Sequence, residues 1–449
     1  MRFVQTIKNI WTIEDLRKRL LITMLLVFIY RLGCYVVLPG ISIEDIKALS
    51  SFTNKTGLMQ LLDMFSGGAF SQASIFALGI MPYITASIVI QLLGMVLPSF
   101  QKMQREGESG RQKLNQYTRY LTVFILLLQG PAYLINLRYQ VAATGTEASM
   151  GFWTTVYLTI ILAAGSMFIM WLGERITDRG IGNGISFIIL VGIIARLPEA
   201  LFYEFVSRLP GETGSQGGLV MFLVEIILLF AVTVGAVLLV QGTRKVPVQY
   251  AKRIVGNRQY GGARQYIPLK VNAAGVMPII FAQAIMFVPI TLAGFGTDSE
   301  SSGFFRAFSD INSFWYNAVY FVMIVAFTYF YTAVTVRPTQ MAEDMKRNNG
   351  FIPGIKPGKK TAEYLDSIMS RITLPGSIFL GIVAILPAFA RFFGISQNFA
   401  QFFGGTSLLI LVGVVLDTLQ QIESHLMMHH YDGLMQGGKI KGRTTGSAY

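Results

Sequence analysis

Few residues of this chain have the types and spacing that chemistry requires. All three histidines lie in HLMMHH, at His425, His429 and His430, but no acidic residue or cysteine completes a metal-ligand set. The glycine-rich stretch Gly173–Ser186, GERITDRGIGNGIS, superficially resembles a phosphate-binding loop, but no strand precedes it. Its glycines are more typical of a tight turn between two helices, with Asn183 or Ser186 at a helix start. These patterns predict no enzymatic activity, no cofactor and no metal site.

Glu225 is the exceptional charged residue, because it lies in the middle of the apolar run LVMFLVEIILLF. Charged residues inside membrane spans often mark proton or ion paths. Arg31 and Asp417 lie near the ends of apolar runs, where long or terminal side chains can reach the membrane surface. Since no partner for Glu225 is evident on another span, we expect a neutral or lipid-edge carboxyl group. A coupling site in a transporter is the alternative.

Transmembrane helices are the elements that must position these residues. Of the 449 residues, 53% are hydrophobic and only 14% are charged, whereas ordinary globular chains carry about 25% charged residues. Unbroken apolar runs favour helices over a β-barrel, whose strands alternate in polarity. We count ten such runs: Leu20–Val37, Ile75–Leu97, Tyr117–Leu137, Gly151–Leu172, Gly184–Leu201, Gly218–Val240, Val271–Ala293, Trp315–Val336, Leu374–Phe393 and Phe403–Thr418.

The basic residues predict how the chain is oriented. If both termini are cytoplasmic, 29 of the 37 Lys and Arg residues fall on the cytoplasmic side, as the positive-inside rule requires. The first apolar run follows the basic residues Arg17–Arg19 but lacks a small-residue cleavage pattern, so we expect a retained span rather than an export signal. Cys34, the only cysteine, excludes an intramolecular disulfide and is expected to be a small packing residue.

Ten spans divide into two sets of five at the outer connection around residues 203–217. We therefore expect an N-terminal half over residues 1–208, a C-terminal half over 209–431 and a cytoplasmic tail over 432–449. Because five is an odd number, the halves enter the membrane in opposite senses, which is typical of inverted-repeat transporters and channels. The predicted fold is an all-α, multi-pass membrane protein with two inverted five-helix halves.

Two cytoplasmic connections, at residues 242–270 and 337–371, are unusually long and basic. The first carries seven positive charges and no acidic residue, and its alternation around Val246–Val255 predicts a hairpin. The second has Pro-Gly turns around a basic tip. Fixing topology and contacting anionic lipid explains part of this charge, but the length favours docking of a large anionic or RNA-containing cytosolic partner, with salt-sensitive affinity. The expected docking residues are Arg244, Lys245, Lys252, Arg253, Arg258, Lys356, Lys359 and Lys360.

A segment at residues 57–70 is too apolar for water and too short to cross a bilayer, which takes about 20 helical residues. Some other part of the protein must cover it.

Six motifs, spaced between these spans, closely resemble the SecY family, the channel subunits of the bacterial protein translocase. They are FSGGAFSQASIFALGIMPYI, EGESGRQKLNQYTRY, MWLGERITDRGIGNGISFII, PLKVNAAGVMPIIFA, GFIPGIKPG and FFGGTSLLILVGV, and the resemblance covers about Leu16–Met428. It implies an hourglass pore in the bacterial plasma (inner) membrane and an unfolded polypeptide as substrate. It also implies the small membrane subunits SecE and SecG, and the motor ATPase SecA or a ribosome as the driving partner.

The resemblance also assigns roles to residues. Residues 57–70 become a plug in the outer funnel, with Leu62, Phe65, Gly67 and Gly68 in the plug and its hinge. The pore ring falls on Ile80, Ile84, Ile189, Ile280, Ala284 and Ile410, and such an apolar ring resists ions by dewetting. A lateral exit into lipid falls between spans 2 and 3 and spans 7 and 8, with the polar residues Thr85, Gln91, Gln129, Asn272 and Gln283. Without a gate, these residues would form interhelical hydrogen bonds of about 0.6 kcal/mol each.

The sequence departs from the family at Lys356, where an arginine is usual. Lysine keeps the charge but lacks the planar fork that makes bidentate contacts.

Two other functions remain open: a secondary transporter coupled through Glu225, and a membrane scaffold for ribosomes that passes no substrate. A transporter predicts loss of uptake after Glu225→Gln. A channel predicts near-normal export after that change, and ion leak after deletion of residues 57–70.

Overall fold

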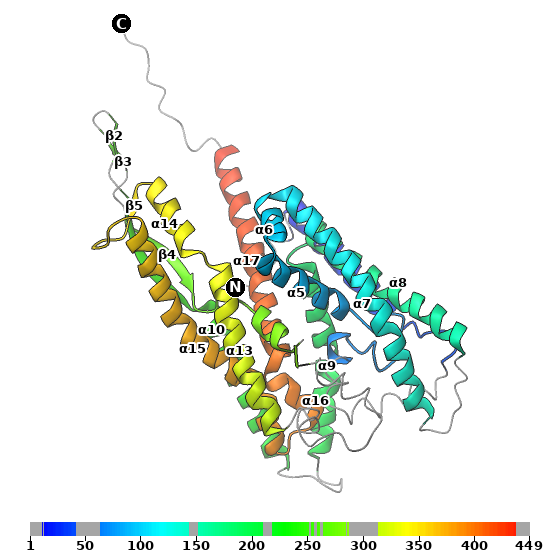
Figure 1. The fold of residues 1–449 in the computed structure, drawn as a ribbon. Coiled ribbons are helices and arrows are strands. Elements are labelled where there is room, and N and C mark those ends of the chain that lie inside the picture. The colour runs from blue at the N-terminus through cyan, green and yellow to red at the C-terminus, as the bar shows by residue number, and fades with distance from the viewer. Residues whose placement is uncertain are drawn as a thin grey trace. The chain divides into compact units, whose positions relative to one another are not determined.

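The structure is a computed structural model that describes residues 11, 13–41, 63–142, 151–209, 218–250, 253–255, 258–260, 264–283, 285–286 and 313–436. The chain forms two compact units, whose elements are labelled in Figure 1. The described residues of the first unit lie within Met1–Phe52, Leu62–Ile194 and Val414–Tyr449, and those of the second within Ala195–Gly413. Two helices therefore contribute to both units, and the halves expected to meet after residue 208 stay a prediction.

The first unit is helical. Its described elements are α2 (Glu14–Gly33), α5 (Met81–Val96), α6 (Pro98–Arg105), α7 (Glu108–Ala142), α8 (Phe152–Arg179), the start of α9 (Gly184–Ser207) and the end of α17 (Gly405–Gln436). Helix α7 packs against α5, α6 and α8, and α2 packs against α8. Between α2 and α5, residues 63–80 form a series of mostly buried turns. α17 continues to Gln436, past the start of the tail expected at residue 432.

The glycine-rich stretch Gly173–Ser186 connects α8 to α9, as predicted. α8 ends at Arg179 and α9 begins at Gly184. Asn183 Oδ1 accepts a hydrogen bond from the Ile185 N–H at 3.2 Å, and Thr177 Oγ1 accepts one from the Gly184 N–H at 2.9 Å. These side chains satisfy backbone donors that a helix start leaves without intrahelical partners. The prediction of a turn capped by Asn183 is confirmed.

The second unit combines helices with short strands. Its helices are the end of α9, α10 (Gly218–Gln241), α13 (Phe314–Thr335), α14 (Pro338–Arg347), α15 (Lys359–Phe392), α16 (Gln397–Ala400), the 3₁₀ turn η1 (Gln401–Phe403) and the start of α17. Its strands are β1 (Thr243–Tyr250), β2 (Arg253–Val255), β3 (Arg258–Tyr260), β4 (Arg264–Lys270) and β5 (Gly350–Phe351). α15 packs against α13 and α14, and α10 contacts both α15 and η1.

Within the described residues, seven helices are long and apolar enough to cross a membrane. An eighth is added if α5 and α6, which are bent by 103° at their junction, form one span. α2 covers most of the first expected span, but it begins with charged residues and contains Arg31. In the seventh expected span, Val271–Ala293, residues 277–283 are helical and several later residues lie outside the described part. The chain is thus a helical, multi-pass membrane protein, and the ten-span count is consistent with the structure.

The two long basic connections fold together. β1 pairs antiparallel with β4, from Thr243↔Lys270 to Gln249↔Arg264, and also with β5, giving the order β4-β1-β5. We call these three strands the basic sheet. A second, two-stranded sheet joins β2 and β3. The prediction of a hairpin around Val246–Val255 is wrong in register, because β1 continues to Tyr250 and its partner begins only at Arg264.

An apolar core lies beneath the basic sheet. It combines alternate residues of β1 with residues of β4, α14, the turn after β5, and α15: Val246, Val248, Leu269, Met345, Ile352, Leu365 and Met369. Alternation along β1 directs Val246 and Val248 to one face while Pro247 is exposed. Because the core draws on both basic connections, neither can form it alone.

Candidate channel and docking sites

The predicted pore-ring residues divide between the two units. Ile80, Ile84 and Ile189 belong to the first unit, in which Ile80 precedes α5 and Ile189 lies on α9. Ile84 lies one helical turn after Ile80, and its N–H donates to the Ile80 carbonyl at 3.1 Å. Ile280 and Ile410 belong to the second unit, and Ala284 lies outside the described residues. Ile80, Ile189 and Ile410 are buried, whereas Ile84 and Ile280 are half-buried. The ring itself stays a prediction.

The predicted gate residues are polar and at least partly shielded. Thr85 Oγ1 donates to the Met81 carbonyl at 3.1 Å, and Gln91 Nε2 donates to Ser87 Oγ at 3.4 Å. Both bonds lie within α5, so for these residues the expected interhelical bonds are replaced by local ones. Gln129 and Gln283 are half-buried. Asn272 is 7% exposed, and its Oδ1 has no hydrogen-bond partner among the described residues.

The described part of the plug segment begins at Asp63, so Leu62 lies outside it. Asp63–Phe65 are helical, and the helix ends in a Schellman motif: the Gly68 N–H donates to the Asp63 carbonyl at 2.8 Å and the Gly67 N–H to the Met64 carbonyl at 3.1 Å. Gly67 has φ +67° and Gly68 has φ +93°, the left-handed region that favours glycine. Phe65, Gly67 and Gly68 are all buried. The hinge role stays a prediction.

Arg31 has a specific partner in this segment. Its Nη1 donates to the Gly67 carbonyl at 2.8 Å, and its guanidinium lies 5.7 Å from the centre of the Tyr35 ring. The expectation that Arg31 only extends toward the membrane surface is therefore wrong, because it binds a backbone carbonyl inside the protein. The neighbouring Tyr30 hydroxyl donates to the Ser66 carbonyl at 3.1 Å.

The predicted docking residues surround the basic sheet. Arg244 and Lys245 are exposed on β1, Lys356 is exposed in the turn after β5, and Lys359 and Lys360 are exposed in the first turn of α15. Gly354 and Gly358, with φ of +85° and +104°, form the Pro-Gly turns that the sequence predicts. Arg253 and Arg258 lie on the paired strands β2 and β3, and Lys252 lies outside the described residues. The fold brings the two basic connections into one module.

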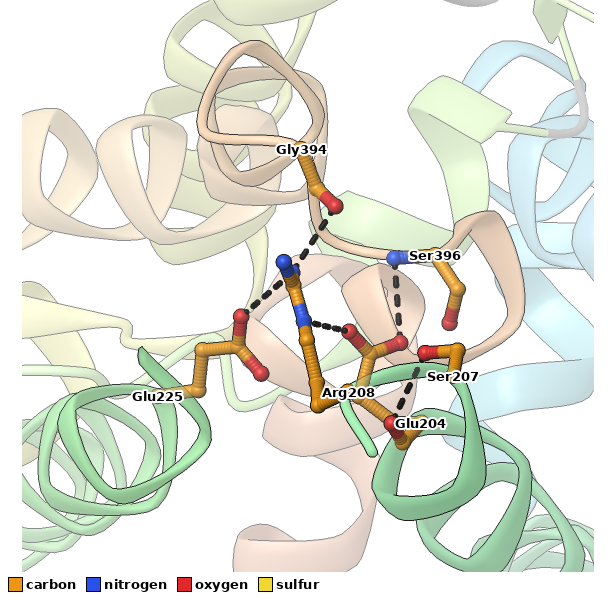
Figure 2. A network of polar contacts seen from close by, with 6 residues as sticks. All are labelled: Glu204, Ser207, Arg208, Glu225, Gly394 and Ser396. Carbon is orange, nitrogen blue, oxygen red and sulfur yellow. Dashed lines mark hydrogen bonds and ion pairs between the residues drawn. The ribbon is translucent and has the colours of Figure 1, made fainter. Parts of the chain in front are cut away.

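Glu225 is the clearest correction, because it is not a lone carboxylate. Figure 2 shows Arg208 between two acidic residues: its Nη2 donates to Glu225 Oε1 at 2.7 Å, and its Nε donates to Glu204 Oε1 at 3.1 Å. Arg208 Nη2 also donates to the Gly394 carbonyl at 2.9 Å, and the Ser396 N–H donates to Glu204 Oε2 at 3.1 Å. We call Glu204, Arg208 and Glu225 the buried triad. It ties the end of α9 to α10 and to the turn before α16.

Sequence reasoning missed Glu204 and Arg208, although a signal was present. The two residues are four apart at the end of an apolar run, which places them on one helix face. Counting Arg208 among the residues of an outer connection hid its relation to Glu225, which lies 17 positions later on another helix. Groups of three or more His, Cys, Asp or Glu residues arranged to hold a metal are absent from the described part of the chain.

Comparisons with known proteins agree with this arrangement. The SecY family model matches residues 74–419. The protein translocase subunit SecY of Streptomyces coelicolor is 43% identical over 433 residues, covering 94% of this chain and 97% of that protein. The corresponding subunit of Mycobacterium tuberculosis is 40% identical over 450 residues, covering 97% and 99%.

Solved structures show a similar fold at low sequence identity. The structure of a protein conducting channel has a TM-score of 0.65 at 18% identity and covers 95% of both chains. Sec61 in the canine ribosome-channel complex has a TM-score of 0.59 at 16% identity, again with 95% of both chains. The family model and the translocase subunits each cover most of the chain, and they show that it belongs to the SecY family of protein translocase subunits.

Proposed function

We propose that this chain is the central subunit of a polypeptide channel that passes unfolded secretory chains across the plasma membrane and releases apolar segments sideways into lipid. The observation that carries the proposal is the match to translocase subunits over 94% of the chain at 43% identity. The chain's own residues supply the means: apolar side chains at the predicted ring and a buried turn where the plug segment ends.

The mechanism depends on an apolar constriction. Isoleucine side chains offer water no hydrogen bonds, so a narrow ring of them dewets and resists hydrated ions. A moving polypeptide finds no fixed polar partner in such a ring and is not held there. Ile80 and Ile84, one turn apart, supply two layers on one helix.

The proposed driving partner docks on the basic module. Exposed Arg244, Lys245, Lys356, Lys359 and Lys360 present positive charge from both connections. The shared core beneath them keeps this surface in one arrangement, so a ribosome or the motor SecA meets a preformed site. SecE and SecG are the proposed membrane partners, and both termini are proposed to be cytoplasmic.

Reconstitution tests the proposal. Vesicles with this chain, SecE and SecG should protect a secretory precursor from external protease when SecA and ATP are supplied, and should not do so without ATP. Protease-sensitive precursor in the complete system would overturn the channel and leave the ribosome scaffold as the better explanation.

A transporter is less well supported because Glu225 is committed to Arg208. A coupling carboxylate must exchange its proton or ion during transport, whereas this one accepts a 2.7 Å hydrogen bond from a buried guanidinium.

A further inference from the structure

The residues Asp63–Ser74, which we call the seat, connect the plug segment to the following helix. We propose that the seat is a fixed anchor that stays in place while a polypeptide passes, and that Gly67 serves close packing and helix termination rather than a hinge. This inference rests on the proposed channel function and changes its mechanics, because movement of the plug must then occur before Asp63.

Three polar side chains hold the seat by its backbone. The Tyr30 hydroxyl donates to the Ser66 carbonyl at 3.1 Å, and Arg31 Nη1 to the Gly67 carbonyl at 2.8 Å. From α7, the Tyr133 hydroxyl donates to the Phe70 carbonyl at 3.1 Å. Breaking a bond of this kind leaves a buried polar group without a partner, a cost of about 1–3 kcal/mol each. Rotation about Gly67 would disturb several of these bonds together.

The two ends of the seat are also secured. Asp63 Oδ1 accepts a hydrogen bond from the Ser71 N–H at 2.7 Å, which closes the seat on itself. Beyond it, the Leu38 N–H donates to the Ala73 carbonyl and the Ile75 N–H to the Val36 carbonyl, both at 2.9 Å. This short antiparallel bridge joins the seat to the chain leaving α2.

Packing explains Gly67 without a hinge. A Cβ at Gly67 would lie 2.9 Å from the Gly192 Cα on α9 and 2.7 Å from Arg31 Nη1. In the reverse direction, a Cβ at Gly192 would lie 3.1 Å from the Phe65 carbonyl oxygen and 3.2 Å from the Gly67 nitrogen. Two glycines thus allow α9 to approach the seat backbone closely. At φ +67°, Gly67 also takes the helix-ending position of the Schellman motif.

The chain contains its own reporter for the seat. Cys34 is the only cysteine, it is 1% exposed, and its Sγ lies 3.9 Å from the Ser66 carbonyl oxygen. Lifting the seat would uncover this thiol. Alkylation of Cys34 by a maleimide therefore measures whether the seat is in place.

The experiment compares Cys34 alkylation in reconstituted vesicles at rest and with a precursor arrested in transit, with complete alkylation in denaturant as the reference. A fixed anchor predicts equally slow alkylation in both states. Alkylation that becomes much faster in the arrested complex overturns the proposal. Precursor protection, measured in the same vesicles, tests the channel function separately, because Cys34 can remain protected at rest whether or not the chain transports.

Gly67→Ala distinguishes an anchor from a hinge. An anchor predicts faster Cys34 alkylation and ion leak already at rest, because the added methyl group displaces Arg31 or α9. A hinge predicts slower transport with Cys34 still protected at rest, and that result would overturn the proposal.

Gly40→Ala is the matched control, because Gly40 also has a left-handed φ of +91° but its added Cβ meets only the Tyr157 hydroxyl, at 4.0 Å. It should leave alkylation unchanged. If Gly67→Ala does not assemble, Tyr133→Phe removes a single donor to the seat. Faster alkylation in that variant supports the anchor, and unchanged alkylation counts against it.

Discussion

Arg208 and Glu225 form an ion pair of 2.7 Å in which the side chains are 5% and 1% exposed. Arg208 also contacts Glu204 at 3.1 Å. A guanidinium between two carboxylates compensates charges that would be costly to bury alone. The buried triad therefore fixes where α9 ends relative to α10 within the second unit.

Replacing Arg208 with Met should destabilise the protein strongly. The change leaves two buried carboxylates without their cation and removes the donor to the Gly394 carbonyl. Loss of one partner from a buried pair costs about 3–5 kcal/mol. We expect a lower apparent melting temperature of the purified protein in detergent. Arg391→Met, at an exposed residue of α15, is the control and should melt near the wild type. Equal melting of both variants would contradict the structural role of the triad.

Glu225→Gln should leave precursor transport close to the wild-type rate. The amide oxygen can still accept the hydrogen bond from Arg208, and Glu204 still compensates the guanidinium charge. The measurement is the amount of protease-protected precursor per unit time in vesicles. A transporter coupled through this carboxylate requires the opposite result, so abolished transport with normal thermal stability would reopen that alternative.

Glu225 shows where single-sequence reasoning reaches its limit. Its place in an apolar run predicts burial and a special role, and both α10 and the burial are observed. Its partner comes from another helix, and the pattern of one span carries no record of which residue lies opposite it. Arg31 failed in the same way: helix position predicts the depth of the side chain, while the Gly67 carbonyl it binds depends on a tertiary turn.

Polar substitutions in the predicted ring should make the resting channel leak. Ile80→Ser and Ile189→Ser place a hydroxyl where we propose a dewetted constriction, which lowers the barrier to water and ions. We expect severalfold faster dissipation of an ion gradient in vesicles without substrate. Ile227→Ser is the control, because Ile227 is 67% exposed on α10. Leak from the control alone, or from none of the variants, would argue against a ring at these residues.

The helices could be predicted more reliably than the basic sheet. Long apolar runs identify spans because backbone groups in lipid must be paired within the helix. The pairing of β1 with both β4 and β5 joins residues about 100 positions apart at Gln249↔Phe351, and strand alternation alone does not select that partner. The seat was likewise beyond prediction, because the same two glycines suit a hinge and a Schellman turn.

Leu365→Ala should loosen both basic connections together. Leu365 is 1% exposed in the core beneath the basic sheet, and a buried Leu→Ala change costs about 2–5 kcal/mol. We expect limited trypsin digestion to cleave within residues 242–270 and 337–371 at similar rates, faster than in the wild type. Leu374→Ala, on the same helix but 52% exposed, is the control. Cleavage confined to one connection would show that the two do not share a core.

Charge at Lys356 should determine how docking depends on salt. Lys356 is exposed in the turn after β5, where a guanidinium would add a planar fork for phosphate or carboxylate. Lys356→Glu should weaken binding of ribosomes to vesicles. If the lysine contacts one RNA phosphate, it should also reduce the slope of log affinity against log salt concentration by about 0.7–0.9. Lys356→Arg should strengthen binding, whereas Lys113→Glu, on another connection, should change little. An unchanged slope in Lys356→Glu would remove this turn from the docking surface.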